Sequence, residues 1–178
     1  MQKIIKSYRI DSAQLKKWDY GSNAIYFVTI NTKHRENFLG ELQNNNGNVT
    51  LNATVMGKLA EQNWLKIPEH FPFIELDVFS ILPDHMHGLL TINKKDKTDW
   101  KPNEFGVQSK NLGSVIRGFK ASLKTFATIN QIPFAWQERY HDSVIRSAEH
   151  LENVREYIIN NQHKHFHQEI FLQLSLQP

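Results

Sequence analysis

The stretch LDVFSILPDHMHGLLTI, residues Leu76 to Ile92, decides the fold predicted for this chain. Both flanks are rich in β-branched and other apolar residues and predict two strands, with a bend at Pro83-Asp84 between them. Residues two apart on a strand project from the same face, so His85 and His87 are expected side by side, with Met86 turned to the opposite layer. Two imidazoles on one face are typical of a metal site that needs a third ligand.

Regular elements are predicted on both sides of this stretch. They are strands over 24–30 and 143–146, a short hairpin within 32–50, and helices over 51–67, 112–129 and 148–164. Residues 170–176 alternate between apolar and other side chains and suggest a terminal strand. The order favours an α+β fold of the ferredoxin-like split βαβ type, a small antiparallel sheet with helices on one face and an extra C-terminal helix that carries a tyrosine.

Composition indicates one globular domain in a chain of 178 residues that is 40% hydrophobic and 22% charged. We expect a basic N-terminal arm over 1–22 and a single domain over 23–178, with a tail from about 165. The chain has no cysteine, which excludes disulfides and thiolate ligands, and no apolar run long enough for a membrane span. A cytoplasmic location is therefore expected. The net charge of +3 is compatible with a nucleic-acid partner but is a weak signal.

The predicted helix over 148–164 carries the second group of candidate residues. Tyr157 and Asn161 are four residues apart and therefore share a helix face. The amide oxygen of Asn161 could join His85 and His87 in a site for Mg²⁺ or, because imidazole ligands favour it, Mn²⁺. A neutral phenol is a weak nucleophile, but a metal that neutralises an attacked phosphate would allow Tyr157 to act as one. The resulting phosphotyrosine would keep the bond energy, so that a broken DNA strand could be rejoined elsewhere.

Two motifs carry a resemblance to a known family. Pro83-Asp84-His85-Met86-His87-Gly88 resembles the HUH signature (histidine, hydrophobic residue, histidine) of single-tyrosine transposases, and residues 157–161 resemble the helix that bears their tyrosine. Other similar segments occur in the same order, so that the resemblance spans roughly residues 26–161; they are 26–30, 112–120, 136–141 and 144–146. Within the IS200-like superfamily the match is to the REP-associated tyrosine transposases, because Asn161 stands where IS200-type enzymes often have Gln.

The resemblance implies an enzyme, a metal-dependent single-stranded DNA endonuclease and strand-transferase, or transposase. This family acts at hairpin-containing DNA through a covalent 5′-phosphotyrosine. Carried over, His85 and His87 are metal ligands, Tyr157 is the nucleophile, Asn161 is the third ligand, and the cofactor is Mg²⁺ or Mn²⁺. One departure is Asn161-Gln162, where such proteins commonly have Asn-Pro, so the helix is expected to continue. Family members include homodimers with shared sites and monomers, and the resemblance leaves both states open.

Basic and aromatic residues in two segments are candidate DNA contacts. They are Arg117, Lys120 and Lys124 on the predicted helix over 112–129, and Lys94, Lys95 and Trp100 in the polar segment 93–110. A second histidine group, His163, His165 and His167, is interpreted as solvated or facing DNA rather than as a metal site. Gln162 and His163 are kept as substitute ligands for Asn161. Two other functions stay open: a catalytically idle DNA-hairpin binding protein on the same fold, and a phosphodiesterase that uses water.

Overall fold

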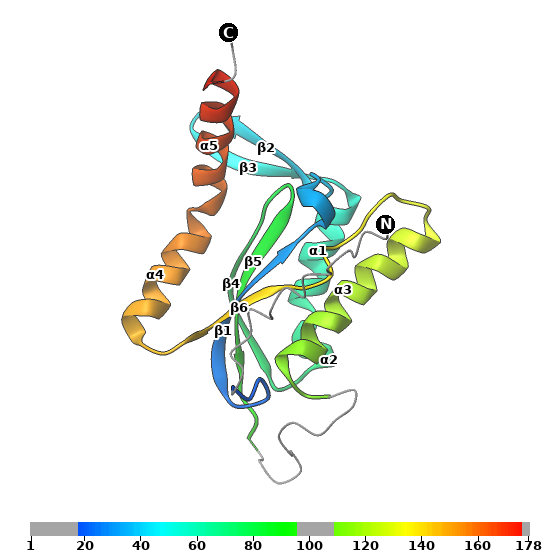
Figure 1. Ribbon diagram of the computed structural model, residues 1–178, viewed down its shortest axis with the longest axis vertical. Helices are drawn as coiled ribbons and strands as arrows, with labels where there is room; N and C mark the ends of the chain where they lie inside the picture. The colour runs from blue at the N-terminus through cyan, green and yellow to red at the C-terminus, as the bar shows by residue number, and fades with distance from the viewer. Residues whose placement is uncertain (1–17, 96–108, 176–178) are drawn as a thin grey trace, which may run out of the picture.

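The computed structural model describes residues 18–95 and 109–175, which form a four-stranded antiparallel sheet with helices on both faces (Figure 1). Its main elements are β1 (Ala24–Asn31), β2 (Gly40–Asn45), β3 (Asn48–Ala53), α1 (Val55–Leu65), α2 (Ile67–His70), β4 (Ile74–Ile81), β5 (His85–Ile92), α3 (Leu112–Ile129), β6 (His141–Ile145), α4 (Ala148–Ile159) and α5 (Asn161–Ser175). The strand order is β4-β5-β1-β6, and β2 and β3 form a separate hairpin inserted between β1 and α1. This is the predicted α+β, ferredoxin-like arrangement. The two strands predicted on either side of Pro83-Asp84 are present as β4 and β5.

One face of the sheet packs against α1 and α3 and contains the main core. Alternate residues of β1 and β5 project into it, and Met86 and Leu90 are fully buried there. Helix α3 spans the residues that the sequence predicts, because its apolar stripe faces this core and a capping box between Asn111 and Ser114 begins the helix. Packing requires glycine at position 88, because a Cβ there would overlap the buried indole ring of Trp64.

The opposite face packs against α4, the predicted extra helix. Leu89, Ile145 and Ile158 are buried in a smaller apolar cluster between this helix and the sheet. Helix α4 begins at Ser147, whose side chain accepts a hydrogen bond from the backbone N–H of His150. The alternation of β5 therefore aims His85 and His87 at the side of the sheet on which α4 lies.

The predicted terminal strand is wrong for residues 170–175, because these continue helix α5. The break between α4 and α5 is slight: the backbone N–H of Lys164 still donates to the carbonyl of Asn160. Phe166, Ile170 and Leu174 are four residues apart, so the same apolar positions also fit a helix. Leu176, like Trp100 and most of the basic arm, lies outside the described residues. Among the helices within the described ranges, none has the length and apolarity that crossing a membrane requires.

Candidate metal and tyrosine site

His85 and His87 project side by side from β5, as their spacing predicts. Both side chains are buried, and their two Nε2 atoms are 3.1 Å apart. On β1, Asn31 pairs with His85 and Thr29 pairs with His87, so the neighbouring strand supplies polar side chains to the same face. Two ring nitrogens this close together can share one cation when each ring carries its proton on Nδ1.

The other nitrogen of each ring is held by a neighbouring side chain. His85 Nδ1 donates to Asp84 Oδ1 at 2.6 Å, and His87 Nδ1 lies 2.8 Å from Thr29 Oγ1. Asp84 is fixed in turn by Arg35, whose Nε lies 2.7 Å from Oδ2. A hydrogen bond of Nδ1 to a carboxylate or hydroxyl is how proteins orient metal-binding histidines, because it directs Nε2 at the metal. The structure thus leaves the two Nε2 atoms for a common ligand.

The electrostatics of the pair favour neutral rings. Burial, and after it the neighbouring His85, lower the pKa of His87 to about 3. Burial also lowers the pKa of His85, although the carboxylate of Asp84 acts against that shift. Burial would raise the pKa of Asp84, but the hydrogen bond and charge of His85 outweigh it and keep that pKa low. Near neutral pH the site therefore has two neutral imidazoles and one buried carboxylate, the protonation states that metal binding requires.

Tyr157 comes to the same place from helix α4. Its hydroxyl oxygen lies 3.5 Å from His87 Nε2, and its ring meets the ring of Phe27 edge-on at a centroid distance of 6.1 Å. The residue is 41% exposed, so a substrate can reach the hydroxyl from solvent. Lys164 places its Nζ 5.7 Å from the centre of the same ring. The hydroxyl thus faces the histidine pair of its own chain.

Three residues four apart along α4 and α5 form a stripe toward this site: Tyr157, Asn161 and His165. His165 Nε2 lies 3.8 Å from Asp84 Oδ1, and its ring centre is 5.6 Å from that of His85. Asn161, one turn before it, is 4% exposed, and its Nδ2 has no hydrogen-bond partner within the described part of the chain. The stripe thus places a buried carboxamide one helical turn from both Tyr157 and His165.

Asp84, His85 and His165 form a second set of metal-ligating atoms, all within 4.8 Å of one another. Within this set His85 Nδ1 already donates to Asp84, whereas His85 Nε2 faces His87 Nε2. We favour the pair as the primary ligands, because both of their Nδ1 atoms already have an orienting partner. The interpretation of His165 as solvated or facing DNA is wrong, because its ring lies beside Asp84 and His85. Its spacing of four from Asn161 was the available signal, whereas His163 and His167 are exposed. Gln162 instead donates its Nε2 to the carbonyl of Ile81 at 2.9 Å.

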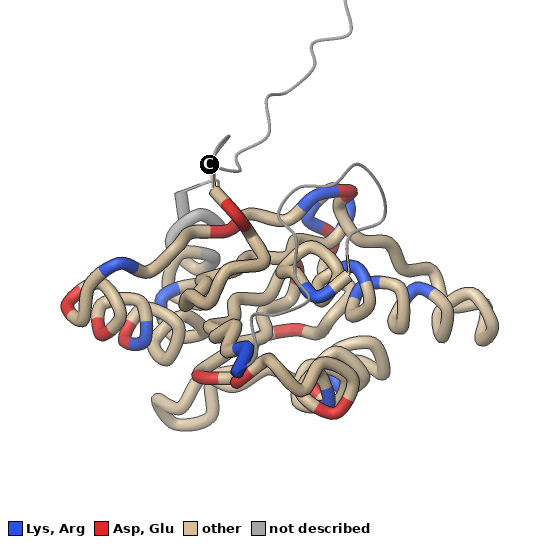
Figure 2. Tube along the Cα trace, turned by 90° about the horizontal axis from the view of Figure 1, so that it is seen from below, with Lys and Arg blue, Asp and Glu red and all other residues tan. Residues whose placement is uncertain are grey.

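The predicted DNA contacts on helix α3 lie apart from the histidine pair. Helix α3 covers the opposite face of the sheet, and two of its lysines bind backbone carbonyls: Lys120 Nζ donates to Gln137, Glu138 and Arg139, and Lys124 Nζ to Phe134 at 3.0 Å. Burial lowers the pKa of Lys120. Lys94 Nζ donates to the carbonyl of Gly21 at 2.6 Å, while Arg117 and Lys95 are exposed. Lys and Arg are spread over several elements among Asp and Glu (Figure 2). Lys120 and Lys124 thus hold the segment before β6 in position.

Comparison with known proteins finds a sequence relative and solved structures that resemble this chain. An uncharacterized protein of Haemophilus influenzae is 32% identical over 159 residues, which cover 84% of this chain and 86% of that protein. A REP-associated tyrosine transposase, solved bound to a REP hairpin, matches 85% of this chain and 73% of its own at 21% identity, with a TM-score of 0.57. A candidate transposase from Deinococcus radiodurans is 17% identical, with coverages of 84% and 98% and a TM-score of 0.39. No family model matches the chain.

Proposed function

The chain belongs to the same family as the Haemophilus influenzae protein and has the fold of a REP-associated tyrosine transposase, and from this premise we propose that it is a transposase-like DNA-processing enzyme. The activity we propose is that of a metal-dependent, single-stranded DNA endonuclease and strand-transferase. One observation carries the proposal: the Tyr157 hydroxyl lies 3.5 Å from His87 Nε2, which is itself 3.1 Å from His85 Nε2. A nucleophile, two neutral metal ligands and an exposed approach are the parts that such a reaction needs.

His85, His87 and Asn161 are the residues we propose as metal ligands, with Mg²⁺ or Mn²⁺ as the ion. When bound, such an ion would neutralise charge on the attacked phosphate. Asp84 and Thr29 keep the two imidazoles oriented through their Nδ1 atoms, and burial keeps both rings neutral. The mixed nitrogen and oxygen donors favour Mn²⁺ over Mg²⁺.

The proposed cleavage step is a phosphoryl transfer to Tyr157. Its hydroxyl oxygen forms a bond to phosphorus, the bond from phosphorus to the 3′ oxygen breaks, and the hydroxyl proton passes on balance to that oxygen. The products are a 5′-phosphotyrosine and a free 3′-hydroxyl. In strand transfer, the 3′-hydroxyl of another strand attacks the phosphotyrosine, and the phenol regains its proton. The edge contact with Phe27 restrains the tyrosine ring, so that little freedom is lost when the substrate binds.

Hairpin-containing single-stranded DNA is the substrate we propose, because the structural neighbour of the same fold binds a REP hairpin. Tyr157 and the histidines meet within one chain, which supports a site made by a single protomer. Mixing a Tyr157→Phe protein with a His87→Gln protein should then fail to restore activity. Restored activity would show instead that two chains share the site.

Trapping the covalent intermediate tests the proposal. The full chain is incubated with labelled hairpin-containing single-stranded DNA and Mn²⁺, and the products are separated on a denaturing gel. We expect a protein–DNA adduct that Tyr157→Phe abolishes and that Tyr20→Phe, a change in the turn before β1, leaves intact. An undiminished adduct in Tyr157→Phe contradicts the nucleophile. Cleavage that survives Tyr157→Phe without an adduct indicates a phosphodiesterase that uses water, and tight binding without cleavage indicates a hairpin-binding protein.

A further inference from the structure

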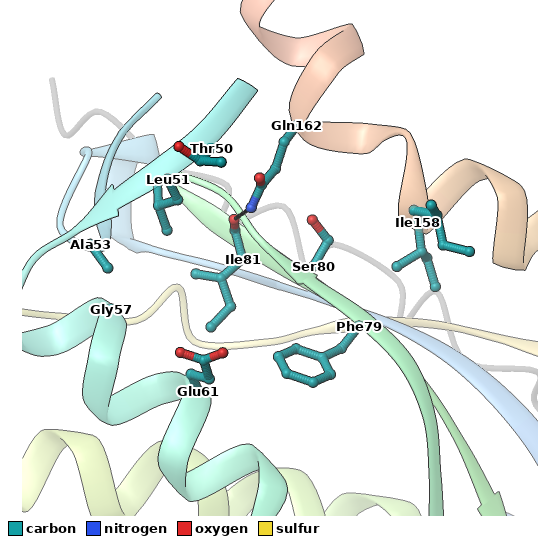
Figure 3. Close-up of a pocket in the computed structure, with 11 residues that line it drawn as sticks. Thr50, Leu51, Ala53, Gly57, Glu61, Phe79, Ser80, Ile81, Ile158 and Gln162 are labelled. Atoms are coloured by element: carbon teal, nitrogen blue, oxygen red, sulfur yellow. Dashed lines mark hydrogen bonds between the residues drawn. The ribbon is translucent and has the colours of Figure 1, made fainter. Parts of the chain in front are cut away.

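A cavity of about 410 Å³ lies at the free edge of β4, the outer strand of the sheet (Figure 3). Side chains from β3 and α1 line one side of it, and side chains from the junction of α4 and α5 line the other. The sequence motifs did not point to this cavity, and the proposed cleavage step does not use it. Its volume lies in the range of small-ligand sites in proteins.

The cavity adjoins the histidine and tyrosine site through two residues. Ser80 pairs with His87 across β4 and β5, so both side chains project from the same face of the sheet. Ile158 directly follows Tyr157 on α4, and both Ser80 and Ile158 line the cavity. A nucleotide next to a phosphate held at Tyr157 would therefore have this cavity beside it.

The lining combines apolar surface with few polar groups. Phe79 and Ile81 of β4 and Leu51 of β3 supply apolar contacts, while Glu61 of α1 and Gln162 of α5 bring a carboxylate and a carboxamide (Figure 3). Gln162 is held in place, because its Nε2 donates to the Ile81 carbonyl at 2.9 Å, which leaves its Oε1 as an acceptor. The polar groups offered to a ligand are thus mainly hydrogen-bond acceptors, together with the hydroxyls of Ser80 and Thr50.

The charge of the lining excludes an anionic occupant. Among the described residues that line the cavity there is no lysine or arginine, and Glu61 would repel a phosphate. A neutral, flat ligand with N–H donors suits these walls, since apolar side chains can contact its faces and the carboxylate can accept from an amino group. Nucleobases with an exocyclic amino group have this chemistry, and thymine lacks the amino group.

We propose that the cavity binds one unpaired nucleobase with an exocyclic amino group (adenine, cytosine or guanine) from the strand beside the cleaved phosphate. Glu61 is the residue that selects for the amino group, and the edge of β4 with Gln162 sets the depth to which the base enters. The inference rests on the proposed function for the identity of the ligand as part of a DNA strand. It makes the cavity a specificity-determining site next to the reacting groups.

Binding of free nucleosides tests this inference without metal, phosphate or cleavage. The full chain, labelled with ¹⁵N, is titrated with each of the four deoxynucleosides, and the amide signals of Ser80, Ile81 and Gln162 are followed by NMR. We expect at least one amino-bearing nucleoside to shift these signals saturably, with thymidine binding more weakly. Glu61→Gln should weaken the preferred nucleoside about tenfold, the loss of one charge-assisted hydrogen bond. Glu69→Gln, an exposed change on α2, should leave the affinity unchanged.

Four results would overturn the inference: no shift with any nucleoside, equal binding of thymidine, the same affinity in Glu61→Gln as in Glu69→Gln, or the same shifts with inorganic phosphate alone. The experiment is also independent of the proposed activity. Nucleoside binding without any covalent adduct would leave the cavity site in place and remove the strand-transferase. An adduct without nucleoside binding would do the reverse.

Discussion

The two faces of the sheet are built from the same strands but serve different ends. On the side of α1 and α3, β5 contributes Met86 and Leu90 to a continuous apolar core. On the side of α4, the intervening residues His85 and His87 are buried with polar partners, and the apolar cluster centred on Leu89 is much smaller. Adjacent residues of one strand therefore contribute to stability on one face and to the candidate site on the other.

This difference predicts which property a substitution on each face should change. Removing an apolar side chain from the main core leaves a cavity and lowers the free energy of unfolding. Removing an imidazole from the other face changes a polar cluster that already lies beside a partly exposed tyrosine. Substitutions at successive positions of β5 should therefore lower activity at one position and stability at the next.

The largest effect is expected on the α4 face, from His87→Gln. Loss of one of two converging Nε2 donors should abolish Mn²⁺ binding and lower the rate of adduct formation by about a thousandfold or more, because the phosphate charge is no longer neutralised. Calorimetric titration with Mn²⁺ and single-turnover gels measure the two quantities, and circular dichroism confirms the fold. Full Mn²⁺ affinity in the variant would remove His87 from the ligand set.

On the other face, Met86→Ala should cost about 2–5 kcal/mol in the free energy of unfolding, as large-to-small changes in a packed core do. Met86 lies between the two histidines in the sequence, but its side chain is fully buried on the other face, toward α1 and α3. Urea denaturation measures the cost, and Mn²⁺ affinity of the folded protein should stay unchanged. A loss of Mn²⁺ affinity equal to that of His87→Gln would mean that the two faces are not separate.

Asp84→Asn should have an intermediate effect through His85. The carboxylate accepts a hydrogen bond from Nδ1 of that imidazole at 2.6 Å. Loss of such an orienting partner typically lowers metal affinity or activity by roughly 10- to 100-fold. Calorimetry with Mn²⁺ gives the affinity. Glu75→Gln, on the outer strand and away from the pair, serves as the matched control. A loss as complete as that of His87→Gln would argue that Asp84 is itself a ligand.

The last effect is expected on the pH dependence of stability in the metal-free protein. The pKa of His87 falls from an ordinary 6.5 to about 3 on folding. Between these two pH values the imidazole is therefore protonated in the unfolded chain but neutral in the folded chain. The contribution of the neutral His87 to the free energy of unfolding is fully present above pH 6.5. It should fall by about 1.4 kcal/mol per pH unit as the pH is lowered toward 3. Urea denaturation at pH 6.5 and 4.5 measures the slope. His87→Gln should reduce it, and Met86→Ala should not.

Local patterns in the sequence determined much of this protein. The period of two along β5 put His85 and His87 on one face, the period near 3.6 defined α3, and the order of elements predicted the ferredoxin-like sheet. These features depend on residues close together in the chain, and so they can be recognised without knowing what packs against them. Alternation misled over 170–175 because Ile170 and Leu174 are also four residues apart, a spacing that fits a helix.

Only the tertiary structure decided which helix covers which face. It brought Tyr157 to His87 and turned His165 toward Asp84, whereas it directed the ammonium groups of Lys120 and Lys124 to backbone carbonyls. It also formed the cavity between β4, α1 and the junction of α4 and α5. Each of these contacts joins residues from different elements, and a side chain's partner there depends on the packing of whole helices against the sheet, which no local periodicity encodes.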